Sequence, residues 1–119
     1  MQRRDEHRLL DMLDAARQVE ELSPTKSRAE FDGDPRVHLS VVYLIQTIGE
    51  AAGHVSEETR ASLPAIDWHK IVGMRNRLVH DYRNIDLDFV WATVQTDIPA
   101  LIAVLEPIVP PPPPDESPA

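Results

Sequence analysis

Apolar residues recur at the three- and four-residue spacing of an α-helix along most of this chain, and prolines separate the stretches. In the first stretch, from residue 3 to about residue 22, they fall on one helical face. These residues are Leu9, Met12, Leu13, Ala16 and Val19. Ser23-Pro24 ends the stretch, because proline disfavours helical geometry in the residue before it. No segment of convincing length alternates as a strand does, so the pattern predicts an all-α fold.

Three further helices are expected from the same spacing. The second runs over about 36–55 and has a wide apolar face. The third runs over about 68–82 and can be capped by Asp67. The fourth can be capped by Asp86 and carries its apolar stripe as far as Leu105. Together with the first helix they predict an up-and-down four-helix bundle.

Short segments are expected between and within these helices. Residues 25–34 read as a connection in which Phe31 is a candidate anchor, and Ser56 is a candidate N-cap of a short helix. Pro99 lies inside the apolar stripe of the fourth helix and should bend that helix or divide it. The bundle is therefore expected to have one or two short accessory helices.

The end of the chain is expected to be a polyproline tail. Five consecutive prolines follow Val109, and such a run cannot be helical and favours the extended polyproline conformation. We therefore expect a helical domain over 1–106 and a flexible, proline-rich tail over 107–119. A tail without function is the simpler expectation, and docking on an aromatic groove is the alternative.

Composition excludes several classes of site. The chain of 119 residues suits one domain, and with no cysteine it has no disulfide, thiolate metal site or cysteine nucleophile. No two of its five histidines stand four residues apart, so no metal site is expected, and no phosphate loop or Gly-rich dinucleotide turn is present, so no cofactor is expected either. The amino terminus lacks the apolar stretch of a signal peptide, and no apolar run approaches the roughly 20 residues that span a bilayer. A cytoplasmic protein without membrane contact is expected.

Charge is distributed unevenly along the chain. A net charge of −8 argues against a general nucleic-acid coat, which needs a basic surface. Residues 69–83 nevertheless hold four cations against one acid, for a sum of +3 (4 − 1); the cations are Lys70, Arg75, Arg77 and Arg83. Such a cationic segment suits contact with one or a few phosphates. Ion pairing with neighbouring acidic helices is the alternative.

The segment with candidate chemistry ends the third helix, Arg75-Asn76-Arg77-Leu78-Val79-His80-Asp81-Tyr82. A histidine can accept the proton of an RNA 2′-hydroxyl near neutral pH, and an arginine can stabilise the negative charge that develops on the phosphate. Arg75 and His80 are five residues apart, about 140° around a helix. They converge only if the helix unwinds near His80, if long side chains wrap around the helix, or if a second subunit completes the site.

The sequence resembles the HepT-like branch of the HEPN superfamily. The resemblance covers roughly residues 5–106 and is most specific between 48 and 101, through Ile48-Gly49-Glu50-Ala51-Ala52, the run from Pro64 to Tyr82, and Ile85-Asp86…Val90-Trp91…Asp97-Ile98-Pro99-Ala100-Leu101. It implies a metal-independent endoribonuclease toxin of a type II or type VII-like toxin–antitoxin pair. The implied partner is a minimal nucleotidyltransferase antitoxin, and the implied substrate is RNA.

The resemblance also implies roles for single residues. The family motif, an arginine followed by a polar residue and then a histidine, matches Arg75, Asn76 and His80 as catalytic residues. The continuation His-x-Tyr matches Tyr82, which the partner enzyme of that branch adenylylates. The family generally works as homodimers whose two motifs face each other. The cations Arg77, Arg83 and Lys70 are then candidate contacts to RNA phosphates. The alternative is a catalytically silent HEPN module that binds a nucleotidyltransferase.

Overall fold

The computed structural model describes residues 1–23, 27–79 and 85–109, and every regular element within them is helical. In chain order these elements are α1 (Arg3–Leu22), α2 (Arg28–Gly33), α3 (Pro35–Gly53), α4 (Glu57–Ser62), α5 (Trp68–Val79), α6 (Leu87–Ala92), the π-helical turn η1 (Thr93–Asp97) and α7 (Ile98–Leu105). The expectation of an all-α fold is confirmed. The first three predicted helices correspond to α1, α3 and α5; α3 begins one residue earlier and ends two residues earlier than predicted, and the predicted end of the third helix lies outside the described residues.

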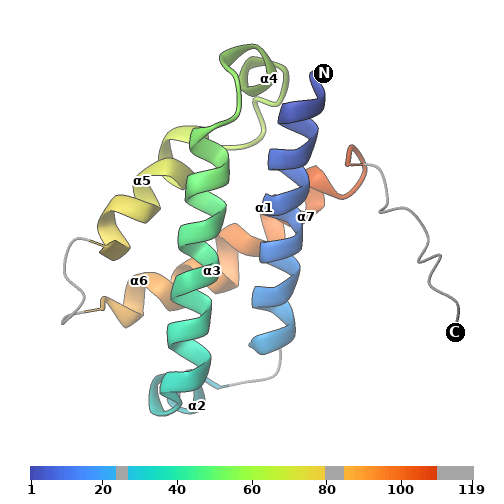
Figure 1. The fold of residues 1–119 in the computed structure, drawn as a ribbon. Coiled ribbons are helices and arrows are strands. Elements are labelled where there is room, and N and C mark those ends of the chain that lie inside the picture. Colours follow the sequence, from blue (N-terminus) through green and yellow to red (C-terminus); the bar gives the residue numbers. More distant parts are fainter. Residues whose placement is uncertain (24–26, 80–84, 110–119) are drawn as a thin grey trace, which may run out of the picture.

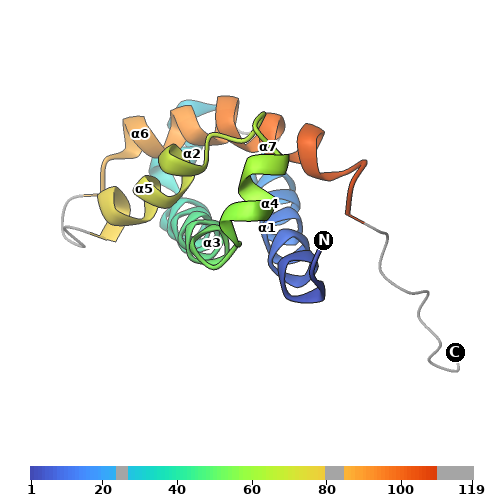
Figure 2. The ribbon, with the colours of Figure 1, turned by 90° about the horizontal axis from the view of Figure 1, so that it is seen from above.

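The two longest helices, α1 and α3, lie side by side and antiparallel (Figure 1). The continuous segment α6–η1–α7 crosses both of them obliquely and packs against α1 through α7. Viewed from above, α5 and α6–η1–α7 lie on the same side of the α1–α3 pair (Figure 2). The up-and-down arrangement therefore describes α1 and α3, and it is not confirmed for the whole molecule.

The core is formed by the apolar stripes that the sequence pattern predicted. All five predicted stripe residues of α1 are buried, and the buried side chains of α3 include Val41, Leu44, Ile45 and Ile48. Phe31 is fully buried, and its ring packs 5.1 Å from that of Trp91, which joins α2 to α6. The prediction that Phe31 anchors its connection is confirmed.

A buried carboxylate joins the start of α1 to the start of α4. Asp5 is only 2% exposed and accepts hydrogen bonds from the Ser56 backbone N–H (3.1 Å), the Ser56 hydroxyl (2.6 Å) and the Thr59 hydroxyl (2.7 Å). These hydroxyl donors, above all that of Ser56, hold the pKa of Asp5 below its ordinary value. Ser56 also caps α4 as predicted, because its hydroxyl accepts from the backbone N–H of Thr59.

The fourth predicted helix continues through Pro99 as α6–η1–α7, with a change of helical geometry just before the proline instead of a division into two helices. The π-helical turn η1 comes directly before α7, and Pro99 occupies the first turn of α7, where a missing backbone N–H is tolerated. Farther along, Val109 is buried and its N–H donates to the Leu105 carbonyl at 2.9 Å, so packing against the core extends beyond Glu106. The five prolines at 110–114 lie outside the described residues.

One helix of the described residues, Leu87–Leu105, is long and apolar enough to cross a membrane by length and composition alone. A third of its apolar window (33%) is buried inside the molecule, where α7 packs on α1. Core helices of water-exposed domains pass the same test, so the finding is weak evidence for a membrane span.

Candidate functional site

The candidate motif lies on α5, and several contacts fix where this helix begins. Asp67 caps it as predicted, accepting a hydrogen bond from the Lys70 backbone N–H at 3.1 Å. The Trp68 indole N–H donates to the Leu63 carbonyl at 3.1 Å, and the Arg60 guanidinium lies 5.8 Å from the centre of the Trp68 ring. Trp68 therefore anchors the first turn of α5.

Arg60 also connects this anchor to the end of α3. Its guanidinium donates to the carbonyls of Ala52 (2.9 Å) and Val55 (3.1 Å), which lie at the carboxyl end of α3. A cation at this position adds a hydrogen bond to carbonyls at and just beyond the end of the helix and interacts favourably with the helix dipole. The segment between α3 and α5 is thus held at both ends.

The buried side of α5 packs against α3 through Ile71 and Met74. Its exposed side includes His69 and Asn76, which are seven residues, or about two turns, apart and therefore lie on the same helical face. Asn76, a predicted catalytic residue, is therefore accessible to a substrate. Arg75 belongs to α5 by its backbone, and its side chain lies outside what the structure describes.

Arg77 connects α5 to α6. Its guanidinium donates to an Asp86 carboxylate oxygen at 3.0 Å and lies 4.0 Å from the centre of the Phe89 ring. Asp86 caps α6 as predicted, accepting from the Phe89 backbone N–H at 3.0 Å. This N–H, together with Arg77, holds the pKa of Asp86 below its ordinary value. We call these three residues the Arg77 brace.

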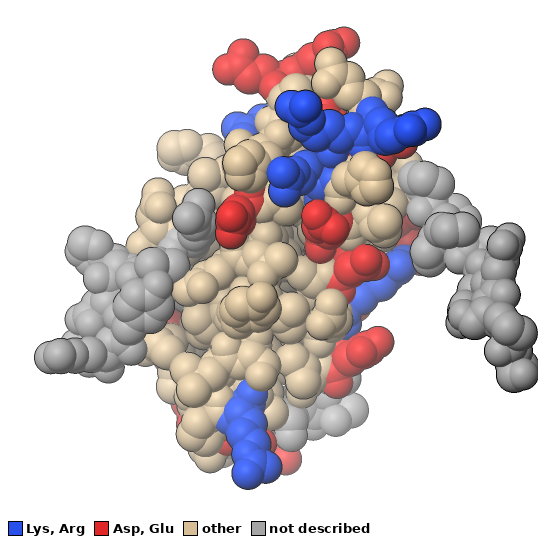
Figure 3. Space-filling view, viewed as in Figure 1, with Lys and Arg blue, Asp and Glu red and all other residues tan. Residues whose placement is uncertain are grey.

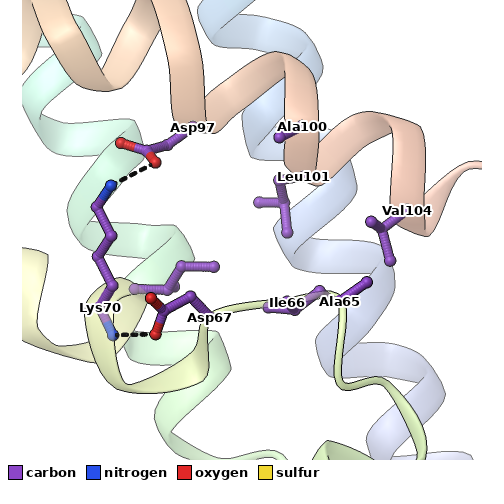
Figure 4. A pocket seen from close by; sticks show the side chains of 9 residues that line it. Ala65, Ile66, Asp67, Lys70, Asp97, Ala100, Leu101 and Val104 are labelled. Atoms are coloured by element: carbon purple, nitrogen blue, oxygen red, sulfur yellow. Dashed lines mark hydrogen bonds and ion pairs between the residues drawn. The ribbon is translucent and has the colours of Figure 1, made fainter.

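Lys70 connects α5 to the end of the π-helical turn. Its Nζ lies 2.8 Å from an Asp97 carboxylate oxygen, and this hydrogen bond raises the pKa of Lys70 (Figure 4). The pair closes one end of a pocket of about 190 Å³ between α5 and α7, whose other walls include Ile66, Leu101 and Val104 (Figure 4).

Two of the four cations in 69–83 are therefore engaged by acidic side chains. Lys70 and Arg77 are seven residues apart and share the face of α5 that looks toward α6–η1–α7. The alternative interpretation of the cationic segment, ion pairing with a neighbouring acidic helix, is confirmed for these two. The other predicted residues in this region, His80, Tyr82 and Arg83, lie outside the described residues.

The sequence interpretation missed the partners of these cations. Asp97 and Phe89 had no recognised role, and Asp86 was predicted only as a helix cap. No pattern within the chain pairs residues 9 or 27 positions apart across a turn. Asp5 was also missed, although a signal existed: it stands four residues before Leu9, in line with the apolar stripe of α1.

Across the part of the chain that the structure describes, no group of three or more histidine, aspartate, glutamate or cysteine side chains is placed to hold a metal ion. The exposed groups on the described part of α5 include the Asn76 amide, His69 and the ion-paired cations Lys70 and Arg77. This set can hydrogen-bond and orient an anionic substrate such as a phosphodiester.

Comparison with known proteins identifies the family. The model of the family described as "Ribonuclease HepT-like" matches residues 12–108. "Putative RNase MJ1380" of Methanocaldococcus jannaschii is 31% identical over 93 residues, which cover 78% of this chain and 85% of the relative. "Probable ribonuclease HepT" of Thermococcus cleftensis is 30% identical over 101 residues, covering 85% and 92%. No solved structure matches the chain. The chain therefore belongs to the HepT-like ribonuclease family of the HEPN superfamily.

Proposed function

We propose that the chain is a metal-independent endoribonuclease toxin whose site is formed by Arg75, Asn76 and His80. The observation that carries this proposal is the family membership, since the relatives are named as ribonucleases and the match includes the whole Arg75–Tyr82 segment. The exposure of Asn76 on α5 supports it, because an accessible amide next to Arg75 can contact a substrate.

The proposed reaction uses only groups of the RNA and of this chain. His80 takes the proton of a 2′-hydroxyl, and the 2′-oxygen attacks the adjacent phosphorus. The bond from phosphorus to the 5′-oxygen breaks, and that oxygen takes up a proton. The products are a 2′,3′-cyclic phosphate and a 5′-hydroxyl end. Arg75 stabilises the charge on the phosphate oxygens, and Asn76 orients the imidazole or hydrogen-bonds the phosphate.

A homodimer is part of the proposal. Arg75 and His80 project about 140° apart on a regular helix, so residues from two copies of α5 can complete a site that one copy leaves open. Pairing two copies also brings two cationic segments together in an acidic protein. Arg83 is then a contact to RNA phosphate, whereas Lys70 and Arg77 reach phosphate only by sharing or leaving Asp97 and Asp86.

The proposed partner is a minimal nucleotidyltransferase antitoxin that adenylylates Tyr82. The phenol oxygen would form a bond to the α-phosphorus of ATP, and pyrophosphate would leave. AMP on Tyr82 would place a bulky anion two residues from His80 and thereby block RNA. After expression of the chain together with an active partner, mass spectrometry of the peptide that contains Tyr82 should find the AMP adduct. An unmodified Tyr82 would contradict this role.

A second candidate function is a catalytically silent module that binds the nucleotidyltransferase. The pairing of Lys70 and Arg77 with acidic residues favours it, because these pairs lower the positive charge available to RNA. Expression without the partner separates the two functions. We expect the wild type to arrest growth, Arg75→Ala and His80→Ala to restore it, and the distant control Arg17→Ala to remain toxic. Equal growth of all four strains at equal protein levels would favour the silent module.

A further inference from the structure

One face of α3 exposes two large apolar side chains. Leu39 is 50% exposed and Tyr43 is 67% exposed, and they stand four residues apart, one turn along the helix. The same face continues to Arg36 at the amino end of α3 and to Glu50 near its carboxyl end, both exposed. We call Arg36, Leu39, Tyr43, Thr47 and Glu50 the α3 stripe. At 100° per residue its members fall within an arc of about 80°.

The α3 stripe is uncharged between its ends. The sequence has no Asp, Glu, Lys or Arg from residue 37 to residue 49. Figure 3 shows the corresponding uncharged surface over the middle of α3, with charged side chains toward its margins. Two copies of a chain with a net charge of −8 repel each other over most of their surfaces. At an uncharged, partly apolar stripe two such copies can come into contact with the least electrostatic repulsion.

The two charges of the stripe are placed symmetrically. Arg36 lies seven residues before Tyr43, and Glu50 lies seven residues after it. Each separation corresponds to about 10.5 Å along the helix axis. If two α3 helices cross antiparallel with a twofold axis at Tyr43, Arg36 of each copy comes opposite Glu50 of the other. This arrangement satisfies the rule that a twofold interface must be complementary to itself.

We propose that the α3 stripe is the self-association face of this chain, with α3 packed antiparallel against α3 of a second copy around Tyr43. The contact has an apolar, aromatic centre and a charge pair at each end, as is usual for specific interfaces. A shallow groove lined by Gln18, Leu22, Leu39, Ser40, Tyr43 and Leu44 runs along one side of the stripe and widens the surface that a second copy can cover. The inference deepens the dimer of the proposed function and names its surface.

Charge reversal at either end of the stripe provides a sharp test, because neither substitution destabilises the α3 helix. Arg36→Glu places an acid in the first turn of α3, and Glu50→Arg places a base in its last turn; both favour the helix dipole. A weakened dimer in either variant therefore reports on association. In each single variant, two pairs of like charges would face each other across the twofold axis.

Sedimentation equilibrium of the full chain at several concentrations measures this association. We expect the wild type to have twice the 13.4 kDa chain mass. We expect Arg36→Glu and Glu50→Arg each to raise the dimer Kd at least about tenfold, and the double variant to return to within about threefold of wild type. The control Arg3→Glu, which changes net charge by the same amount as Arg36→Glu but at the start of α1, should leave the Kd unchanged. Circular dichroism checks that each variant is folded.

Several outcomes would contradict the inference. A monomeric wild type would show that no second copy of the chain binds the α3 stripe. A dimer that both single variants leave unchanged would use a different face, and a double variant without recovery would exclude the antiparallel register. RNA cleavage, measured on the same samples, keeps the two proposals separate. A dimer that cuts no RNA contradicts only the proposed function, whereas a dimer that cuts RNA but is unaffected by both single variants contradicts only the α3 pairing.

Discussion

At the scale of single residues, Asp5 occupies a position on α1 where the apolar stripe would otherwise place a hydrocarbon side chain. Its carboxylate is buried and accepts three hydrogen bonds from Ser56 and Thr59. An ionised group in such a place stabilises the fold only because every donor is aligned with it. It thereby fixes α4, and with α4 the segment that leads into α5.

Replacing this carboxylate with an amide should destabilise the protein. Asp5→Asn keeps the shape but loses the charge that strengthens the three hydrogen bonds, so we expect a loss of about 2 kcal/mol of unfolding free energy at pH 7. Because the folded-state pKa of Asp5 is lowered, the wild-type advantage is fully present above the unfolded pKa of about 3.9. It should disappear as the pH falls through the folded-state pKa.

Urea unfolding of the wild type and Asp5→Asn between pH 7 and pH 3 measures this advantage. The exposed acid Asp11 on the same helix offers a matched control, and Asp11→Asn should change stability little at any pH. A difference between wild type and Asp5→Asn that stays constant with pH would show that the carboxylate charge contributes nothing.

Helix caps were the residue-scale features that the sequence predicted best. Asp67, Asp86 and Ser56 all cap as expected, because capping depends on residues two or three positions away in the chain. The partners of Lys70 and Arg77 were not predictable in this way. They depend on where α6–η1–α7 packs beside α5, and the packing of two helices is not encoded within either one.

At the scale of secondary-structure elements, the Arg77 brace determines how α5 and α6 meet. The guanidinium lies over the Phe89 ring while it donates to Asp86. The brace spans the two ends of the segment that contains His80, Tyr82 and Arg83. It therefore gives Arg77 a structural role, beside the phosphate contact that the sequence suggested.

A double-mutant cycle can measure the contact between Arg77 and Phe89. We expect Arg77→Met and Phe89→Leu to be coupled by about 0.5–1 kcal/mol in unfolding free energy, the value typical of an exposed cation–π contact. Arg17→Met combined with Phe89→Leu is the control, because Arg17 lies by Glu106 instead. Urea unfolding of the variants supplies both cycles. Additive effects of Arg77→Met and Phe89→Leu would contradict the brace.

The sequence predicted the position of the interruption in the fourth helix, but it did not predict that the interruption is a π-helical turn. Proline lacks a backbone N–H, and its ring collides with the carbonyl four residues earlier, which made an interruption near Pro99 predictable. The chain accommodates this with the wider π-helical turn η1 instead of a separation into two helices. A π turn depends on local hydrogen bonding that residue spacing does not reveal.

At the scale of the whole molecule, the sequence predicted the helices and their buried faces but not their arrangement. Apolar periodicity identifies which side of a helix is buried. It does not specify the crossing angle, which depends on how side-chain ridges fit between two surfaces. The oblique path of α6–η1–α7 across α3 and α1 therefore emerged only from the structure (Figure 1). The family resemblance was recognisable because it rests on residue identity.

The central claim concerns RNA cleavage by the Arg75–His80 motif, and purified protein tests it most directly. Wild type, Arg75→Ala, His80→Ala and the control Arg17→Ala are incubated with RNA in excess EDTA, and the ends of the products are analysed. We predict that wild type and Arg17→Ala cut RNA to 2′,3′-cyclic phosphate and 5′-hydroxyl ends. We predict that each motif variant is slower by at least about a hundredfold. Intact RNA with the wild type, or equal cleavage by all four proteins, would contradict the claim.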